Sequence, residues 1–175
     1  MGESELLLET QRFRVVRRWQ TTPDGARYER QFVEHPGSVV ILPILDQGQV
    51  CLIRNRREAV DKTLIELPAG TREPNESPEE TARRELLEET NYEAKTVELL
   101  HEFYMSPGIL NERMYLYLAK NLSPAVGRTD PGEQIETFLA GFDDALQMVE
   151  DGRIEDAKTI VGLLFYDRFR RQWPG

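Results

Sequence analysis

The stretch from Gly70 to Tyr92, GTREPNESPEETARRELLEETNY, carries the strongest structural signal in this chain. Ser77 and Glu80 form an S-x-x-E capping box, in which each residue satisfies a backbone N–H group of the other. Pro78 stands at the first helical position, where its missing N–H group costs nothing. The pattern therefore predicts a helix over residues 78–90.

Three glutamates near the end of this helix stand at positions i, i+3 and i+4: Glu85, Glu88 and Glu89. Their carboxylates are expected to share one side of the helix, while Ala82 and Leu86 face a core. Like charges at these spacings repel one another, and negative charge near a helix C-terminus opposes the helix dipole. The cluster should therefore need a cation, and hard oxygen ligands select Mg²⁺ or Mn²⁺. The alternative is a solvated charged face, which is common in a chain with 31 acidic residues.

Composition narrows the class of protein. A length of 175 residues with 39% hydrophobic residues fits one domain with a core. The net charge of −9, without a basic block, argues against polymeric nucleic acid as a partner. No segment approaches the roughly 18 apolar residues of a membrane span, so no membrane association is expected. The single cysteine, Cys51, has no internal disulfide partner, which favours a reducing compartment and the cytoplasm as the location.

The order of the predicted elements indicates a mixed fold. Strands over 13–19 and 28–33 flank a turn at 22–25 and should form a hairpin, and a second strand pair is expected over 38–45 and 49–54. Other expected strands cover 62–66, 95–103, 113–119 and 134–139, with a mobile polar loop over 121–132 and closing helices over 143–151 and 155–173. This order predicts an α+β or α/β fold in which helices sandwich a mixed sheet, with an N-terminal antiparallel hairpin region.

The quoted stretch also matches a family signature. Its residues fit GX5EX7REUXEEXGU, the signature of the Nudix hydrolases, at Gly70, Glu76, the Arg84-Glu85-Leu86 run and the two following glutamates. One specified position departs, because Asn91 replaces the final glycine. Asparagine is the usual second choice where a helix ends in a left-handed residue, so a small loss of stability is expected rather than a lost site.

Segments outside the signature resemble the ADP-ribose pyrophosphatase branch of that family. They are HPGSVV at 35–40, LIELPAG at 64–70, Ser106-Pro107-Gly108 with Glu112, and DAKT at 156–159. The resemblance implies a Nudix-type α/β/α sandwich over 37–175. It also implies a preceding β region over 1–36 that exchanges between subunits and helps to build the site, so we expect a homodimer.

The resemblance further implies which residues hold the metal and carry the reaction. The Ala69 carbonyl is expected as a metal ligand, together with Glu85, Glu88 and Glu89. Arg84 should orient these glutamates, and Glu76 should accept hydrogen bonds within the loop before the helix. The general base is expected in the stretch GEQIE at 132–136, with Glu133 as the candidate and Glu136 behind it. An alternative reading makes both of them solvated acids at the start of a strand.

Substrate contacts come from the same resemblance. Arg57 aligns with an arginine that meets the phosphates, and Glu112 with a residue that holds the distal ribose hydroxyls. Glu66 and Pro107, within the matched segments, are also expected on the substrate side. Arg56 and Glu58 stand where aromatic residues are common in the branch, which leaves base selectivity open. A basic strand edge that favours solubility is the alternative reading of these arginines.

The implied reaction is metal-dependent hydrolysis of a nucleoside diphosphate sugar, and ADP-ribose would give AMP and ribose 5-phosphate. Three alternatives remain open: a GDP-mannose type substrate, a non-catalytic Nudix sensor that binds nucleotide, and hydrolysis of nucleoside triphosphates. The resemblance at Ser106-Pro107-Gly108 and the long N-terminal hairpin region argue against the third. Such sensors usually lose signature carboxylates, which this chain retains. Glu89→Gln is expected to lose metal affinity and most activity without unfolding, on the premise that Glu89 is a surface charge.

Overall fold

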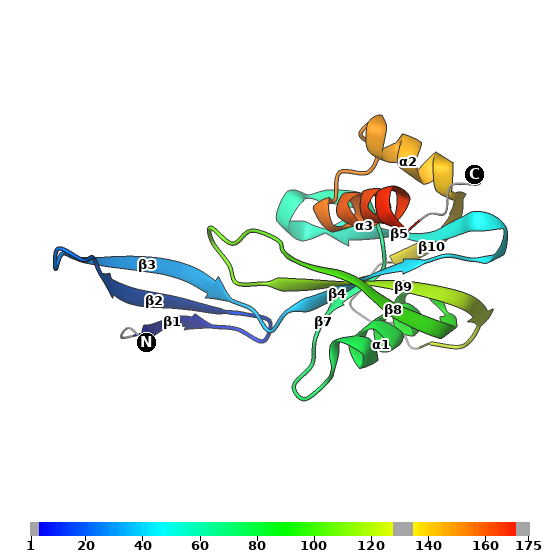
Figure 1. Cartoon of the computed structure of the whole chain (residues 1–175). Helices are drawn as coiled ribbons and strands as arrows, with labels where there is room; N and C mark the ends of the chain where they lie inside the picture. The colour runs from blue at the N-terminus through cyan, green and yellow to red at the C-terminus, as the bar shows by residue number, and fades with distance from the viewer. Residues whose placement is uncertain (1–3, 128–134, 171–175) are drawn as a thin grey trace.

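The computed structural model describes residues 4–127 and 135–170. Figure 1 shows a three-stranded N-terminal sheet that projects from a body of two further sheets and three helices. The strands are β1 Ser4–Glu9, β2 Arg14–Thr21, β3 Arg27–Glu34, β4 Ser38–Pro43, β5 Gln49–Arg57, β6 Lys62–Glu66, β7 Ala69–Thr71, β8 Tyr92–Tyr104, β9 Arg113–Pro124 and β10 Ile135–Gly141. The helices are α1 Pro78–Thr90, α2 Phe142–Glu150 and α3 Ala157–Phe169, with single 3-10 turns at Asp46–Gly48 and Glu58–Val60.

The N-terminal sheet contains the predicted hairpin and one strand more. β2 and β3 pair antiparallel from Arg14↔Glu34 to Thr21↔Arg27, so the expected hairpin is confirmed. β1 adds to the free edge of β2, with a bulge at its centre. β1 is not among the strands expected from the sequence, because its run SELLLE has none of the β-branched residues that mark strands.

The body contains a mixed sheet in the order β7-β4-β9-β8 and an antiparallel sheet in the order β10-β5-β6. Only β4 and β9 run parallel in the first of these. The expected pairing of 38–45 with 49–54 is wrong for the strands themselves, because β4 and β5 belong to different sheets. The two predicted segments pair only at the isolated bridge Ile44↔Val50, just after β4. The reason lies in burial, since all six residues of β4 are buried and a strand covered on both faces takes a central position.

Alternate residues of β4 face two separate layers. Val39 and Ile41 pack with Ala82 and Leu86 of α1. Val40 and Leu42 belong to the larger core, which includes Leu163 of α3. The period of two in the strand thus places one helix on each face of the sheet. Figure 1 shows α1 on one side and α2 and α3 on the other, which confirms the α/β/α sandwich.

Helix α1 begins and ends where the sequence predicts. Ser77 accepts a hydrogen bond from the N–H group of Glu80, and Glu80 accepts one from that of Ser77, which completes the capping box. Asn91 ends the helix in the left-handed region at φ 56°, as expected for the position that glycine holds in the signature. Its side-chain Oδ1 also accepts the N–H group of Gly127 at 3.0 Å.

Two predictions near the C-terminus need correction. The expected loop over 121–132 is a strand in its first part, because β9 continues to Pro124, while residues 128–132 lie outside the described part. α3 begins two residues later than predicted, since Asp156 caps it by accepting the N–H group of Thr159 at 3.0 Å. Residues 171–173 of that predicted helix also lie outside the described residues. Among the helices described, none is long and apolar enough to cross a membrane.

Candidate active site

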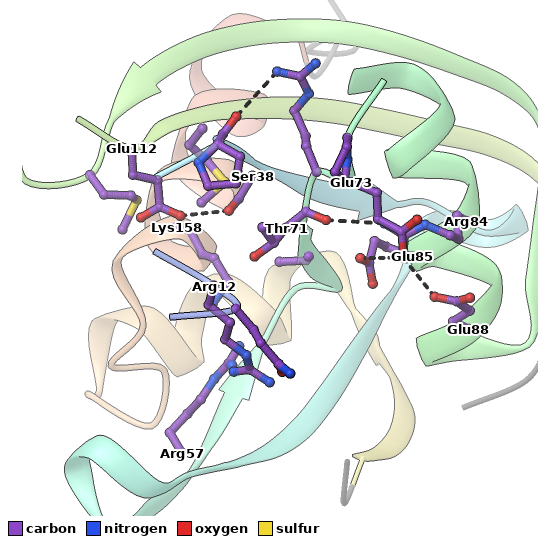
Figure 2. Close-up of a pocket in the computed structure, with 18 of the residues that line it drawn as sticks. Arg12, Ser38, Arg57, Thr71, Glu73, Arg84, Glu85, Glu88, Glu112 and Lys158 are labelled. Atoms are coloured by element: carbon purple, nitrogen blue, oxygen red, sulfur yellow. Dashed lines mark hydrogen bonds and ion pairs between the residues drawn. The ribbon is translucent and has the colours of Figure 1, made fainter. Parts of the chain in front are cut away.

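A cavity of about 820 Å³ opens beside helix α1. Its walls come from α1, β7, the loop after β7, the start of α3 and the turn between β1 and β2. Figure 2 shows Glu85 and Glu88 on one side of it and Arg12, Arg57 and Lys158 on the other. The size suits a nucleotide-sized ligand.

Arg84 is the centre of the acidic wall. Its guanidinium donates to both carboxylate oxygens of Glu76, at 2.9 and 3.0 Å. It also donates to Glu85 at 2.7 Å and to Glu88 at 2.9 Å. The repulsion that the sequence predicts within the glutamate cluster is thus partly offset by a cation of the same helix.

These contacts shift the pKa values of Glu76 and Arg84 in opposite directions. The hydrogen bond from Arg84 holds the pKa of Glu76 down at about 2, and the same contact raises the pKa of Arg84. Glu76 also accepts from Thr81 Oγ1 at 2.8 Å and from the N–H group of Glu73. Glu76 therefore joins the loop before α1 to the helix itself, which is the structural role expected from the sequence.

Gly70 lets Glu85 approach the backbone of β7. A Cβ atom at Gly70 would lie 1.9 Å from the carboxylate of Glu85, far inside any real contact. The glycine is needed here for close approach, since the absent side chain is the space that the carboxylate occupies.

Glu89 lies behind this wall and not on the surface. Only 5% of the residue is exposed, and its carboxylate accepts the N–H group of Ala69 at 2.8 Å. The backbone carbonyl of Glu89 accepts from Thr137 of β10. The premise that Glu89 is a surface charge is therefore wrong: α1 packs this side chain against β7, a contact that helical spacing does not reveal.

The oxygen donors of this wall fit a hard divalent cation in their chemistry. Ala69, Glu85 and Glu88 line the same cavity, and carboxylate and carbonyl oxygens are the ligands that Mg²⁺ and Mn²⁺ prefer. In the part of the chain that the structure describes, no group of acidic, histidine or cysteine side chains forms a ready-made metal cluster. Arg84 meanwhile holds two of the carboxylates beside each other.

The opposite wall is built on a buried carboxylate. Glu66 has no exposed surface, and both its oxygens accept from Arg57, at 2.7 and 2.6 Å. Lys158 donates to it at 2.5 Å and to Asp156 at 2.9 Å. Burial raises the pKa of Glu66, but the hydrogen bonds and charges of Arg57 and Lys158 outweigh it, so the net pKa is lowered.

This geometry revises the role of Glu66 and adds Lys158. Glu66 does not line the cavity, whereas Arg57 and Lys158 do. Glu66 therefore holds the side chains of Arg57 and Lys158, and these two cations are the groups that face the cavity. Lys158 is not among the site residues expected from the sequence, although it lies in the DAKT segment. Only the folded chain shows that the start of α3 meets the end of β6.

The other expected substrate residues have different positions. Glu112 lines the cavity, accepts from Ser38 Oγ at 2.7 Å and lies 3.6 Å from Nδ1 of His35. Pro107 is exposed, in the turn after β8, and does not line the cavity. The structure thus brings Glu112 to the site and leaves Pro107 outside it.

The predicted general base lies outside the described residues, because these exclude 128–134 and with them Glu133. Glu136 lies in β10, where it is largely exposed and 3.2 Å from Arg54. It is thus at the edge of the β10-β5-β6 sheet, and it is absent from the cavity lining.

Comparison with known proteins identifies this arrangement. The NUDIX domain family matches residues 34–161, which is more than half of the chain. The chain belongs to the Nudix family. This confirms the resemblance read from the stretch at 70–92.

Several characterised relatives share this Nudix domain. The chain is 37% identical over 145 residues to an ADP-ribose pyrophosphatase of Bacillus subtilis (strain 168), covering 82% of this chain and 78% of the relative. Over the same length and coverage it is 36% identical to a methanol dehydrogenase activator of Bacillus methanolicus. It is 39% identical over 140 residues to a GDP-mannose pyrophosphatase of Yersinia pestis (strain Pestoides F), covering 74% and 69% of the two chains.

A solved structure supports the Nudix fold. The crystal structure of an ADP compounds hydrolase superposes with a TM-score of 0.83, covering 95% of this chain and 91% of that one. The two sequences are only 23% identical. Because the superposition covers 95% of this chain, it extends over the N-terminal sheet as well as the sandwich.

Proposed function

We propose that this Nudix protein hydrolyses the phosphoric anhydride of a nucleoside diphosphate sugar to a nucleoside monophosphate and a sugar phosphate. The observation that carries the proposal is the pair of opposed walls of one cavity. Glu85 and Glu88 lie on one side, and Arg57 and Lys158 on the other. A diphosphate needs cations along its oxygens, and its hydrolysis needs a charged centre beside the reacting phosphorus.

The proposed cofactor is Mg²⁺ or Mn²⁺, held by the Ala69 carbonyl, Glu85 and Glu88, with Glu89 behind them. When bound, such an ion would neutralise phosphate oxygens and lower the pKa of a water molecule. Glu89 accepts from the N–H group of Ala69, so it helps to hold in place the residue whose carbonyl is the proposed ligand.

The other residues of the proposed site each have a separate role. Arg84 keeps Glu85 and Glu88 in place. Arg57, oriented by Glu66, binds phosphate oxygens, and Glu112 accepts from sugar hydroxyls. Glu133 remains the proposed general base, which takes the proton of the attacking water.

ADP-ribose is the first substrate to test, and GDP-mannose the second. The names of two relatives point to these compounds. Arg56, at a position where the branch commonly has an aromatic residue, forms an ion pair with Glu58 at 3.5 Å and another with Asp61. Arg56 and Glu58 offer no aromatic ring for a nucleobase, so we propose that selectivity for adenine arises from other contacts of this chain. Retention of the signature carboxylates supports catalysis over a sensor role.

The assembly and location are proposed on other grounds. We propose a homodimer formed through the N-terminal β region, 1–36, with 37–175 as the hydrolase domain. All six residues of β1 are exposed, among them three successive leucines, and such a strand fits a second copy of the chain. Cys51 is buried and unpaired, which suits a reducing compartment such as the cytoplasm.

The test is a substrate panel. The purified protein is incubated with Mg²⁺, and separately with Mn²⁺, together with ADP-ribose, GDP-mannose, dinucleoside polyphosphates or nucleoside triphosphates, and the products are separated by chromatography. Release of AMP and ribose 5-phosphate from ADP-ribose is the expected result. Preference for triphosphates would refute the substrate class, and nucleotide binding without turnover would favour the sensor.

The variant Glu88→Gln tests whether the acidic wall takes part in catalysis, with Glu93→Gln as its matched control. Removing one carboxylate of the acidic wall should lower kcat at least about 100-fold, whereas Glu93→Gln, an exposed acid at the start of β8, should leave kcat unchanged. An unaltered kcat in the Glu88 variant would remove the acidic wall from the mechanism.

A further inference from the structure

The turn between β1 and β2 carries two residues, Gln11 and Arg12, into the wall of the cavity. Thr10 shapes this turn. Its Oγ1 donates to the carbonyl of Phe13 at 2.8 Å and accepts the N–H groups of Arg12 at 3.2 Å and Phe13 at 3.0 Å. The backbone N–H of Thr10 also donates to the Phe13 carbonyl, at 3.0 Å. These bonds hold the tip of the turn without any contribution from the Arg12 side chain.

The direction of the N-terminal sheet is set at its other end. Val33 donates its N–H group to Ile109 at 2.8 Å and accepts that of Asn111 at 3.1 Å. His35 donates its N–H group to Oδ1 of Asn111 at 2.8 Å. Since these bonds tie the end of β3 to the loop after β8, the sheet leaves the body in one direction. The presence of the β1–β2 turn at the cavity therefore follows from the fold.

Arg12 differs from the other cations of the cavity. Arg57 and Lys158 are paired with Glu66, and Arg84 with three glutamates. Arg12, by contrast, has no carboxylate within ion-pair distance in the part of the chain that the structure describes. Figure 2 shows it on the same side of the cavity as Arg57 and away from Glu85 and Glu88.

A cation placed beside other cations is stabilised only when an anion joins them. The positive charges of Arg57 and Lys158 are already partly neutralised by Glu66. These two residues alone therefore neutralise only part of the negative charge of a diphosphate. A guanidinium without an acidic partner has its full set of N–H donors available for phosphate oxygens.

We propose that Arg12 is a substrate-binding residue, which contacts phosphate oxygens of the nucleoside diphosphate from the turn between β1 and β2. The N-terminal sheet thus supplies part of the binding site in addition to its edge for assembly. This inference rests on the proposed function for the identity of the ligand, and the position of the residue at the cavity does not depend on it.

Steady-state kinetics with ADP-ribose or GDP-mannose, whichever the wild type turns over, provide the first test. Arg12→Ala should raise KM at least about 10-fold with kcat within twofold, because it removes a contact made equally in the ground state and the transition state. Arg12→Lys should recover part of the loss, as it keeps the charge without the fork of donors. Arg30→Ala, on β3 of the same sheet and outside the cavity lining, should match the wild type. A KM for Arg12→Ala within twofold of the wild-type value would overturn the proposal.

Binding of inorganic pyrophosphate, measured by calorimetry without turnover, provides the second test. Arg12→Ala should weaken it about 10-fold relative to the wild type and to Arg30→Ala, while thermal unfolding and sedimentation stay unchanged. Equal affinities would overturn the proposal even if the enzyme is active. Weaker binding in a protein that hydrolyses no nucleoside diphosphate sugar would support the role of Arg12 and refute the proposed function.

Discussion

At the scale of single residues, the site depends on one missing side chain. The carboxylate of Glu85 occupies the space where a side chain at Gly70 would stand, 1.9 Å from an added Cβ. Helix α1 supplies the acid, and β7 supplies the gap that receives it. The glycine of the signature is therefore a packing requirement of the acidic wall.

Gly70→Ala should disable the enzyme without unfolding it. The added methyl group has to displace the Glu85 carboxylate, so we expect kcat to fall about 100-fold, with the circular dichroism spectrum unchanged. Gly108→Ala is the control, because a Cβ there meets nothing within 4 Å. Near-normal turnover in the Gly70 variant would show that the position of Glu85 is not needed.

The charge of Glu76 contributes to the stability of the folded protein. Its pKa lies at about 2 when folded, against an ordinary value of 4.5, because Arg84 hydrogen-bonds to its charged form. The ionised form thus favours the folded state. This contribution is complete above pH 4.5 and is lost as the pH falls from 4.5 towards 2.

Glu76→Gln should accordingly destabilise the protein in a pH-dependent manner. We expect a loss of about 2 kcal/mol in the free energy of unfolding at pH 7, and a smaller difference from the wild type at pH 3. Urea unfolding at the two pH values measures this, with the exposed Glu93→Gln as a control within about 0.5 kcal/mol. A difference that stays constant between the two pH values would contradict the assignment.

At the scale of elements, helix α1 is defined by its two ends. The capping box at its start is complete in the structure, as the sequence indicates. At its end, the side chain of Asn91 contributes as well as its backbone conformation, because it accepts the N–H group of Gly127. Gly127 itself lies so close to the helix that an added Cβ atom would be 2.2 Å from the carbonyl oxygen of Leu87. The segment after β9 thus packs closely on the end of the helix.

Asn91→Gly should therefore be nearly neutral or slightly destabilising, not stabilising as its φ of 56° alone would suggest. The gain of about 0.5–1 kcal/mol from relaxed backbone strain is offset by the lost hydrogen bond to Gly127. Asn91→Ala should lose both and cost about 2 kcal/mol. Chemical denaturation measures the series, and Asn75→Gly, at φ 68° on an exposed loop, is the control for strain alone. Clear stabilisation by Asn91→Gly would mean that the side-chain bond contributes nothing.

At the scale of the whole molecule, the N-terminal sheet projects from the body (Figure 1). It leaves apolar side chains open to solvent. Leu6 is 45% and Leu8 is 52% exposed, on a strand whose outer edge has no partner in the described chain. Such an edge favours pairing with a second copy. The sheet would then serve assembly through β1 and the substrate through the turn that follows it.

The double variant Leu6→Glu/Leu8→Glu should shift the protein from dimer to monomer. Charged side chains on β1 oppose both burial and edge pairing. Sedimentation velocity measures the shift, and Val126→Glu, which is 94% exposed on the body, should stay dimeric. A wild type that sediments as a monomer at micromolar concentration would refute the dimer.

The local part of the fold was predictable from neighbouring residues. Ser77, Pro78 and Asn91 mark the ends of α1 through contacts within a few positions, and the hairpin of β2 and β3 follows from its turn. The partner of β4 was not predictable in the same way. A strand that is buried throughout carries no sign of which neighbour it pairs with, so the nearest one in sequence was the wrong choice.

The sequence by itself determined the family, the helix with its glutamates and the chemistry of their oxygen donors, because these depend on residue types at fixed spacing. Only the tertiary structure decided that Glu89 is buried, that Glu66 orients Arg57 and Lys158, and that Arg12 reaches the cavity. Each of these facts joins segments far apart in the chain. Packing between such segments sets burial and charge pairing, and no local pattern encodes it.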